Sequence, residues 1–196
     1  MAADSIRIAL RVKSRILPMS DDPVPTMIDS NEGSLHFQEY LVKRRTEPVV
    51  TGIRFAGVES ALPAPSVLEA IRDADRIVIC PSNPLISIGP ILAVPQIRDQ
   101  LRAHKEKVFA ACPIVGGKSL KGPSDKMLAQ LGHDSTALGV AKLYADFTGT
   151  FIIDPADKSQ SAAISALGMQ VVILPTVMKT LAQKRKLARA LRSLSL

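Results

Sequence analysis

The chain has 196 residues, of which 46% are hydrophobic and 4% aromatic, so a sizeable aliphatic core is available for one domain of ordinary size. The 25 lysines and arginines exceed the 18 aspartates and glutamates by seven, and this net charge of +7 favours anionic partners such as nucleotides, nucleic acid or phosphorylated metabolites. Apolar runs stay well short of the ~20 residues of a membrane span, and the N-terminus lacks a signal-peptide pattern. We therefore expect a cytoplasmic protein that does not cross a membrane.

The first 65 residues have an irregular pattern interrupted by six prolines. Residues 15–19 (RILPM) and 49–55 (VVTGIRF) are predicted strands. Residues 35–45 (LHFQEYLVKRR) fit either a helix or an amphipathic strand.

After residue 65, strand-like and helix-like segments alternate. Ser66 and Ser124 are predicted N-caps of helices, and Gly168 is predicted to end one. The predicted strands are 76–80, 107–114, 150–154 and 170–175. The predicted helices are 67–74, 88–93, 96–104, 125–131, 138–146, 158–167 and 177–194.

The strands in this second part are continuously apolar, which is typical of a parallel sheet buried on both faces. Helices between successive strands supply the crossovers that a parallel sheet needs. We therefore predict an α/β fold: a single Rossmann-like domain over residues 1–196, with a mostly parallel sheet and helices on both faces.

Small polar residues follow the first of these strands. Ser82, Asn83 and Ser87 lie beyond its carboxyl end, where ligands bind in open parallel sheets. Ser87 is predicted to cap a helix that starts near Ile88, whose free N–H groups would form an anion site. The alternative is a tight strand-to-helix turn with ordinary caps.

Glycines and lysines follow the next strand. Gly116 and Gly117 allow backbone N–H groups to face a phosphate, and Lys118, Lys121 and Lys126 add positive charge. A Walker motif is absent, so a solvated basic loop is the alternative. Both loops are expected at the same edge of the sheet.

Two other features have competing interpretations. Asp21 and Asp22 could hold Mg²⁺ through their oxygens or form an Asx-type turn before Pro23. The basic C-terminal helix is interpreted as a solvated face rather than a nucleic-acid site, because no aromatic stacking residue accompanies it. Cys80 and Cys112 lie in apolar runs without metal-ligand spacing, and both are predicted to be buried reduced thiols.

Five stretches resemble, in order, segments of the 2-phospho-L-lactate transferase family: LPMSDDPV, HFQEYLVKRR, CPSNPLISIGPILAVPQIR, PIVGGKSLKGPSDKML and GVAKLYADF. The combination of PSNPxxSIGPILAVP with PIxGGKxxxGP is highly specific. Gluconeogenesis-factor proteins are related in fold and usually lack the SNP and SIGPIL residues.

The resemblance implies an Mg²⁺-dependent, usually dimeric enzyme of deazaflavin coenzyme factor 420 biosynthesis, with a Rossmann-like fold. It would transfer a 2-phospholactyl or phosphoenolpyruvyl group from a guanosine-diphosphate-linked donor to the deazaflavin Fo and release GMP. The candidate contacts to the guanosine diphosphate part are Ser82, Asn83, Ser87 and Ile88, with Gly116, Gly117 and Lys118 as a second set.

Members of this family normally begin with a strand and a GGTGGAK-like glycine-rich loop, followed by an Asn/Asp-rich segment where metal and deazaflavin contacts are expected. A GGTGG-like string is absent from the 196 residues, so the chain resembles the C-terminal part of a longer transferase. Two alternatives stay open: a non-catalytic nucleotide-binding or regulatory protein of the gluconeogenesis-factor type, and an inactive truncated transferase.

Overall fold

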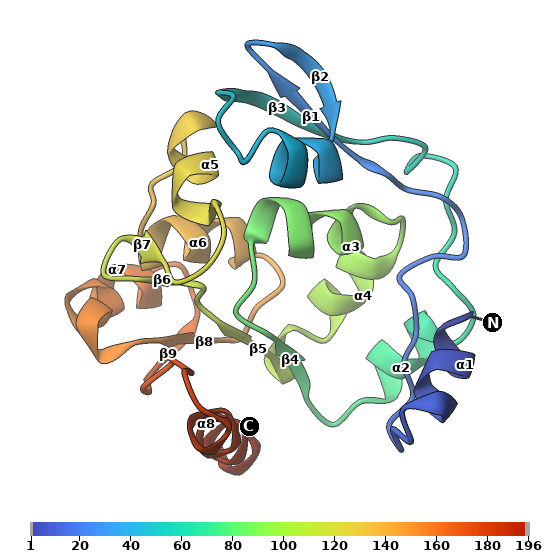
Figure 1. Cartoon of the computed structure of the whole chain (residues 1–196). Helices are drawn as coiled ribbons and strands as arrows, with labels where there is room; N and C mark the ends of the chain where they lie inside the picture. Colours follow the sequence, from blue (N-terminus) through green and yellow to red (C-terminus); the bar gives the residue numbers. More distant parts are fainter. Residues whose placement is uncertain (1, 195–196) are drawn as a thin grey trace.

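The largest sheet has four parallel strands. A computed structural model describes residues 2–194, with side chains from Asp4 onward (Figure 1). Strands β4 (Ile77–Ile79), β5 (Val108–Ala111), β8 (Thr150–Ile153) and β9 (Gln170–Ile173) lie in the order β4-β5-β8-β9, and every pair is parallel. All residues of β5 and β8 are buried. The predicted parallel sheet is thus confirmed, and its apolar strands are central because both faces are covered.

Helices pack on both faces of this sheet. One face carries α3 (Gly89–Ala93), α4 (Ile97–Ala103) and α6 (Ala137–Tyr144), whose apolar side chains form the main core with alternate residues of β5 and β8. The opposite face is packed against α8 (Leu181–Ser193), whose Leu187 and Leu191 contact the other residues of the same strands. The predicted α/β, Rossmann-like class is confirmed.

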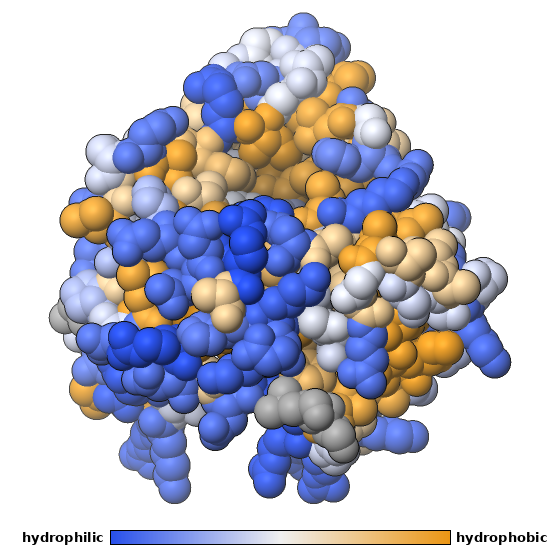
Figure 2. Space-filling view, turned by 180° about the vertical axis from the view of Figure 1, so that it is seen from behind, coloured by the Kyte–Doolittle hydropathy of each residue, from blue (hydrophilic) through white to orange (hydrophobic). Residues whose placement is uncertain are grey.

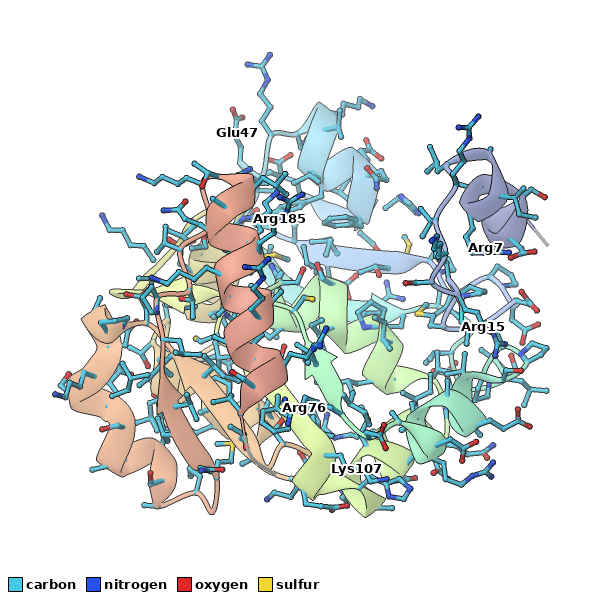
Figure 3. All side chains as sticks on the ribbon, turned by 90° about the horizontal axis from the view of Figure 1, so that it is seen from below. Arg7, Arg15, Glu47, Arg76, Lys107 and Arg185 are labelled. Atoms are coloured by element: carbon cyan, nitrogen blue, oxygen red, sulfur yellow. The ribbon has the colours of Figure 1, made fainter. Side chains whose placement is uncertain are left out.

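The C-terminal end of α8 is held by Arg76, which immediately precedes β4. Figure 3 shows α8 crossing the sheet, with Arg76 beside its C-terminal end and Arg185 toward its other end. The Arg76 guanidinium donates hydrogen bonds to the carbonyls of Leu191 and Leu194 and lies 4.6 Å from the centroid of the Phe109 ring. A cation there satisfies orphan carbonyls and complements the helix dipole.

A small antiparallel sheet lies above the body. Strands β1 (Thr26–Ser30), β2 (Gly33–His36) and β3 (Val50–Phe55) are ordered β2-β1-β3, and a π-helical turn, η1 (Glu39–Lys43), connects β2 toward β3 (Figure 1). The prediction of β3 is confirmed. Residues 15–19 form no strand, and β1 was not predicted, because only Ile28 in it is buried and its pattern lacks strict alternation. The range 35–45, predicted as a helix or a strand, holds both the end of β2 and the helical turn η1.

Three side chains join the small sheet to the body at α5 (Ser124–Gln130). The Val50 N–H donates to Gln130 Oε1 at 3.0 Å, and Lys126 Nζ donates to the Glu47 carbonyl at 3.2 Å. Below them, Asn83 Nδ2 contacts Met127 Sδ at 3.7 Å. The small sheet is therefore fixed over the loop that follows β4.

Several predicted helix starts are displaced. Helix α5 begins at Ser124 itself, with Pro123 in the N-cap position, and Ser66 stands at the N-cap of α2 without a side-chain cap bond. Helix α8 begins at Leu181, because Thr180 and Gln183 form a capping box there. The other elements are α1 (Ala2–Ala9), α2 (Val67–Asp73), η2 (Pro84–Ile88), η3 (Lys105–Lys107), β6 (Ile114–Val115), β7 (Lys118–Ser119), η4 (Pro155–Gln160) and α7 (Ser161–Ser165).

The two cysteines differ in environment. Cys112 is buried, as predicted, whereas Cys80 is exposed, because β4 is an edge strand and Cys80 follows its last residue. Within residues 2–194, every helix is too short or too polar to cross a bilayer.

Candidate functional site

A cavity of about 440 Å³ opens at the carboxyl ends of the parallel strands. Loops after β4 (residues 81–87), β5 (112–124) and β9 (176–178) form most of its wall. Ligands of open α/β sheets bind at this edge, where successive loops converge. The remaining wall comes from Phe37 and Leu41 near η1 and from Lys184 of α8.

The loop after β4 is organised by Asn83. Its Oδ1 accepts hydrogen bonds from the N–H groups of Leu85 (2.8 Å) and Ile86 (3.3 Å), so Asn83 is the N-cap of a helix that starts at Pro84. The predicted cap by Ser87 is wrong: Asn83 caps the helix at an earlier position, and a proline in the first helical position starts the helix one turn earlier. Ser87 lies inside that first turn.

This geometry changes the chemistry expected of the loop. The Leu85 and Ile86 N–H groups are satisfied by Asn83, so they are not free to bind an anion. Ser82 and Ser87 line the cavity, and their side chains bond to no other described residue. Ile88, the fourth candidate here, is outside the lining. Hydroxyl groups, rather than a bare helix start, are therefore the ligands that this loop offers.

The second predicted loop is a β-hairpin turn. Gly116 and Gly117 have φ values of +58° and +78° between β6 and β7, which glycine adopts without strain. The Gly116 N–H donates to both carboxylate oxygens of Asp157, at 3.2 and 3.1 Å. Lys118 is exposed in β7, and these three predicted residues lie outside the cavity lining.

Two lysines supply the positive charge of the cavity: Lys121, which was predicted together with Lys118, and Lys184, which was not. Lys121 comes from the loop before α5, and Lys184 comes from the first turns of α8. Neither side chain forms an ion pair or hydrogen bond with another residue of the described chain. Sequence reasoning did not assign Lys184 to the site, because its position depends on how α8 docks beneath the sheet.

The cavity provides groups for binding but no activated nucleophile. Cys112 lines it, and burial raises the pKa of this thiol to about 12, so it stays protonated at neutral pH. Thr176 is held in place, since its N–H and hydroxyl both donate to Asp154 Oδ2, at 2.9 and 3.3 Å. Hydroxyls and ammonium groups of this kind suit phosphate binding and positioning.

Asp21 and Asp22, the predicted metal ligands, do not reach the cavity. Asp22 Oδ2 accepts from the Leu62 N–H at 2.9 Å, and its own N–H donates to Ser20 Oγ, which fastens this loop to residues 62–63. The described part of the chain contains no group of three His, Cys, Asp or Glu residues placed to hold a metal. The two carboxylates therefore do not fit a metal centre on their own.

A second cavity of about 640 Å³ lies beneath the small sheet, between β3 and α6. Figure 2 shows an apolar hollow between the upper part of the molecule and the body, seen from behind. Its cations are paired: Arg98 with Asp146 at 2.7 Å and Lys142 with Asp134 at 3.0 Å. This cavity is therefore less suited to an anion than the first.

Comparisons with known proteins identify relatives along most of the chain. The chain is 43% identical to a 2-phospho-L-lactate transferase of Methanothermobacter thermautotrophicus, over 93% of this chain and 58% of the relative. It is 39% identical to a phosphoenolpyruvate transferase of Kitasatospora aureofaciens, over 92% of this chain and 58% of the relative. The chain therefore spans little more than half the length of these relatives.

A solved structure shares the fold. The crystal structure of a UPF0052 family protein from Bacillus halodurans matches with a TM-score of 0.68 and 17% identity, covering 97% of this chain and 65% of the other. The profile of the family described as 2-phospho-L-lactate transferase CofD matches residues 1–185. The chain thus belongs to the 2-phospho-L-lactate transferase CofD family.

Proposed function

We propose that this chain carries the nucleotide-binding part of a transferase that moves a 2-phospholactyl or phosphoenolpyruvyl group to the deazaflavin Fo. The donor is linked to guanosine diphosphate, and GMP is released. The observation that carries the proposal is the cavity at the loop edge of the parallel sheet, with two unpaired lysines in a chain of this family.

The chemistry of the reaction agrees with what the cavity offers. Attack by a hydroxyl of the acceptor on a diphosphate needs positioning and neutralisation of charge more than a protein nucleophile. Ser82, Ser87, Lys121 and Lys184 provide hydrogen-bond donors and positive charge toward the phosphates. Asn83 is a positioning residue, since its side chain is used to cap the helix.

The other predicted properties remain part of the proposal. Gly116, Gly117 and Lys118 would support the site from the neighbouring hairpin. Mg²⁺ usually keeps phosphate oxygens among its ligands, so it would enter with the nucleotide rather than at a prebuilt protein centre. A homodimer in the cytoplasm is expected from the resemblance.

The first experiment measures GDP binding by isothermal titration calorimetry, with and without Mg²⁺. Lys184→Gln is expected to weaken GDP binding about tenfold, because it removes a charge-assisted contact to phosphate. Lys186→Gln is the matched control, because Lys186 lies on the same helix, is exposed and is outside the cavity lining. Equal affinities of the two variants would contradict the assignment of Lys184.

A turnover assay with Fo and the donor then separates a transferase from a binding protein. GMP release dependent on Fo supports the transferase. GDP binding without turnover supports the non-catalytic nucleotide-binding alternative. Binding of RNA in place of GDP would reject both.

A further inference from the structure

Phe37 contributes an aromatic side chain to the wall of the first cavity. It follows β2, is half-buried, and is the aromatic residue among the described residues of the lining. Leu41, one helical turn further on, lines the cavity beside it. This wall is apolar, and the hydroxyl and lysine groups lie elsewhere in the lining, among further apolar residues such as Leu120 and Met178.

Packing limits how far the Phe37 ring can move. It contacts the buried cluster that contains Ile28, Tyr40 and Ile86, and Ile86 also lines the cavity. The following turn is π-helical, with the Arg44 N–H donating to the Glu39 carbonyl at 2.9 Å. Single π-helical turns occur often at functional sites. The aromatic wall is therefore preorganised before any ligand binds.

The cavity has chemically different ends. The helical turn that carries Leu41 lies above the loop edge of the sheet, whereas α8, which carries Lys184, lies below the sheet (Figure 1). A ligand that matches both ends has a flat apolar ring at one end and phosphate at the other. Nucleotides have this build, because every base presents a π-face to an aromatic side chain.

We propose that Phe37 stacks on the planar heteroaromatic ring of the bound substrate while the phosphates lie toward Lys184. This inference rests on the proposed function. The ring is either the guanine of the donor or the deazaflavin of the acceptor, and both present the same flat π-face. Phe37 is thus a specificity-determining residue for ligands that carry a ring.

The test compares three probes: GDP, inorganic pyrophosphate and riboflavin as a flavin-like ring without phosphate. Phe37→Leu and Phe37→Met keep apolar contact but remove the ring, and both should weaken ring-bearing probes about 5- to 100-fold. Phe37→Tyr should retain the affinity of the wild type. Phe55→Leu is the matched control, because Phe55 lines the second cavity.

Pyrophosphate affinity should stay unchanged in all variants, which also shows that each is folded. A loss confined to GDP assigns the ring to guanine, and a loss confined to riboflavin assigns it to the deazaflavin. If Phe37→Leu and Phe37→Met bind GDP and riboflavin as tightly as the wild type, the stacking proposal is overturned while the proposed function stands. If the wild type binds none of the three probes, both proposals fall.

Discussion

Replacing Asn83 by alanine should destabilise the protein and disorganise the cavity together. Asn83 is 8% exposed, and its side chain accepts from the Leu85 and Ile86 N–H groups. Alanine leaves these two donors without their partner at the start of the helix that forms one wall of the cavity. The affected helix continues from η2 into α3 and packs against the main core.

The expected loss can be estimated from the contacts. Loss of an N-cap costs about 0.5–2 kcal/mol, and an unsatisfied buried donor costs about 1–3 kcal/mol. Ile86 is buried, but its bond to Asn83 is long at 3.3 Å, so we expect a total of roughly 2 kcal/mol. For a chain of this size, each 1 kcal/mol lowers Tm by about 2–4 °C, which gives a decrease of about 4–8 °C.

Two control variants separate capping from packing. Asn83→Ser and Asn83→Asp both keep an oxygen that can cap the helix, so they should retain most of the stability in a thermal melt. Asn83→Asp should nevertheless bind GDP more weakly, because its negative charge is placed in the wall of the proposed anion site. A Tm of Asn83→Ala within about 1 °C of the wild type, in the same thermal melt, would refute the capping role, because even the smallest expected decrease is about 4 °C.

Three further outcomes are expected. The pKa of Asp146 is lowered to about 2, first by the hydrogen bonds that Arg98 donates and then by those of Arg102, so its stabilising effect should be present at neutral pH and disappear between about pH 4 and 2. The gap in urea midpoint between the wild type and Asp146→Asn should close over that range. Only one thiol per native chain should react rapidly with a disulfide reagent at pH 8, because Cys80 is exposed whereas Cys112 is buried and has a raised pKa. Rapid reaction of two thiols per chain would contradict this expectation. Gly149→Ala should lower Tm by several degrees, because its Cβ would lie 2.5 Å from the Lys105 carbonyl oxygen; an unchanged melt would show that this backbone can move aside.

The parallel sheet was predictable because its signal is local. Each residue of β5 and β8 is apolar or small enough to be buried, apart from the Thr150 hydroxyl, and the sequence shows this directly. The hairpin of β1 and β2 was missed for the opposite reason. In β1, Ile28 is fully buried while its neighbours are half-exposed, and this depends on the position of the small sheet over α5.

The cavity was predictable in location, whereas the roles of the residues that line it were less so. The rule that ligands bind beyond the carboxyl ends of parallel strands placed Ser82, Asn83 and Ser87 in the cavity wall. The role of each residue depended on a competition between caps, in which Asn83 displaced Ser87. The residues around Gly116 could not show whether its N–H group is free to bind a ligand. The group donates to Asp157, which lies 41 residues further along the chain.

Asn83 also explains why the small sheet and the loop after β4 should respond together. Its oxygen holds the helix start that lines the cavity, whereas its amide nitrogen contacts Met127, which belongs to the buried cluster beneath the small sheet. The same cluster supports Phe37, which also lines the cavity. A change in this cluster therefore acts on both parts of the cavity lining, so ligand affinity should depend on residues of the small sheet that never touch the ligand.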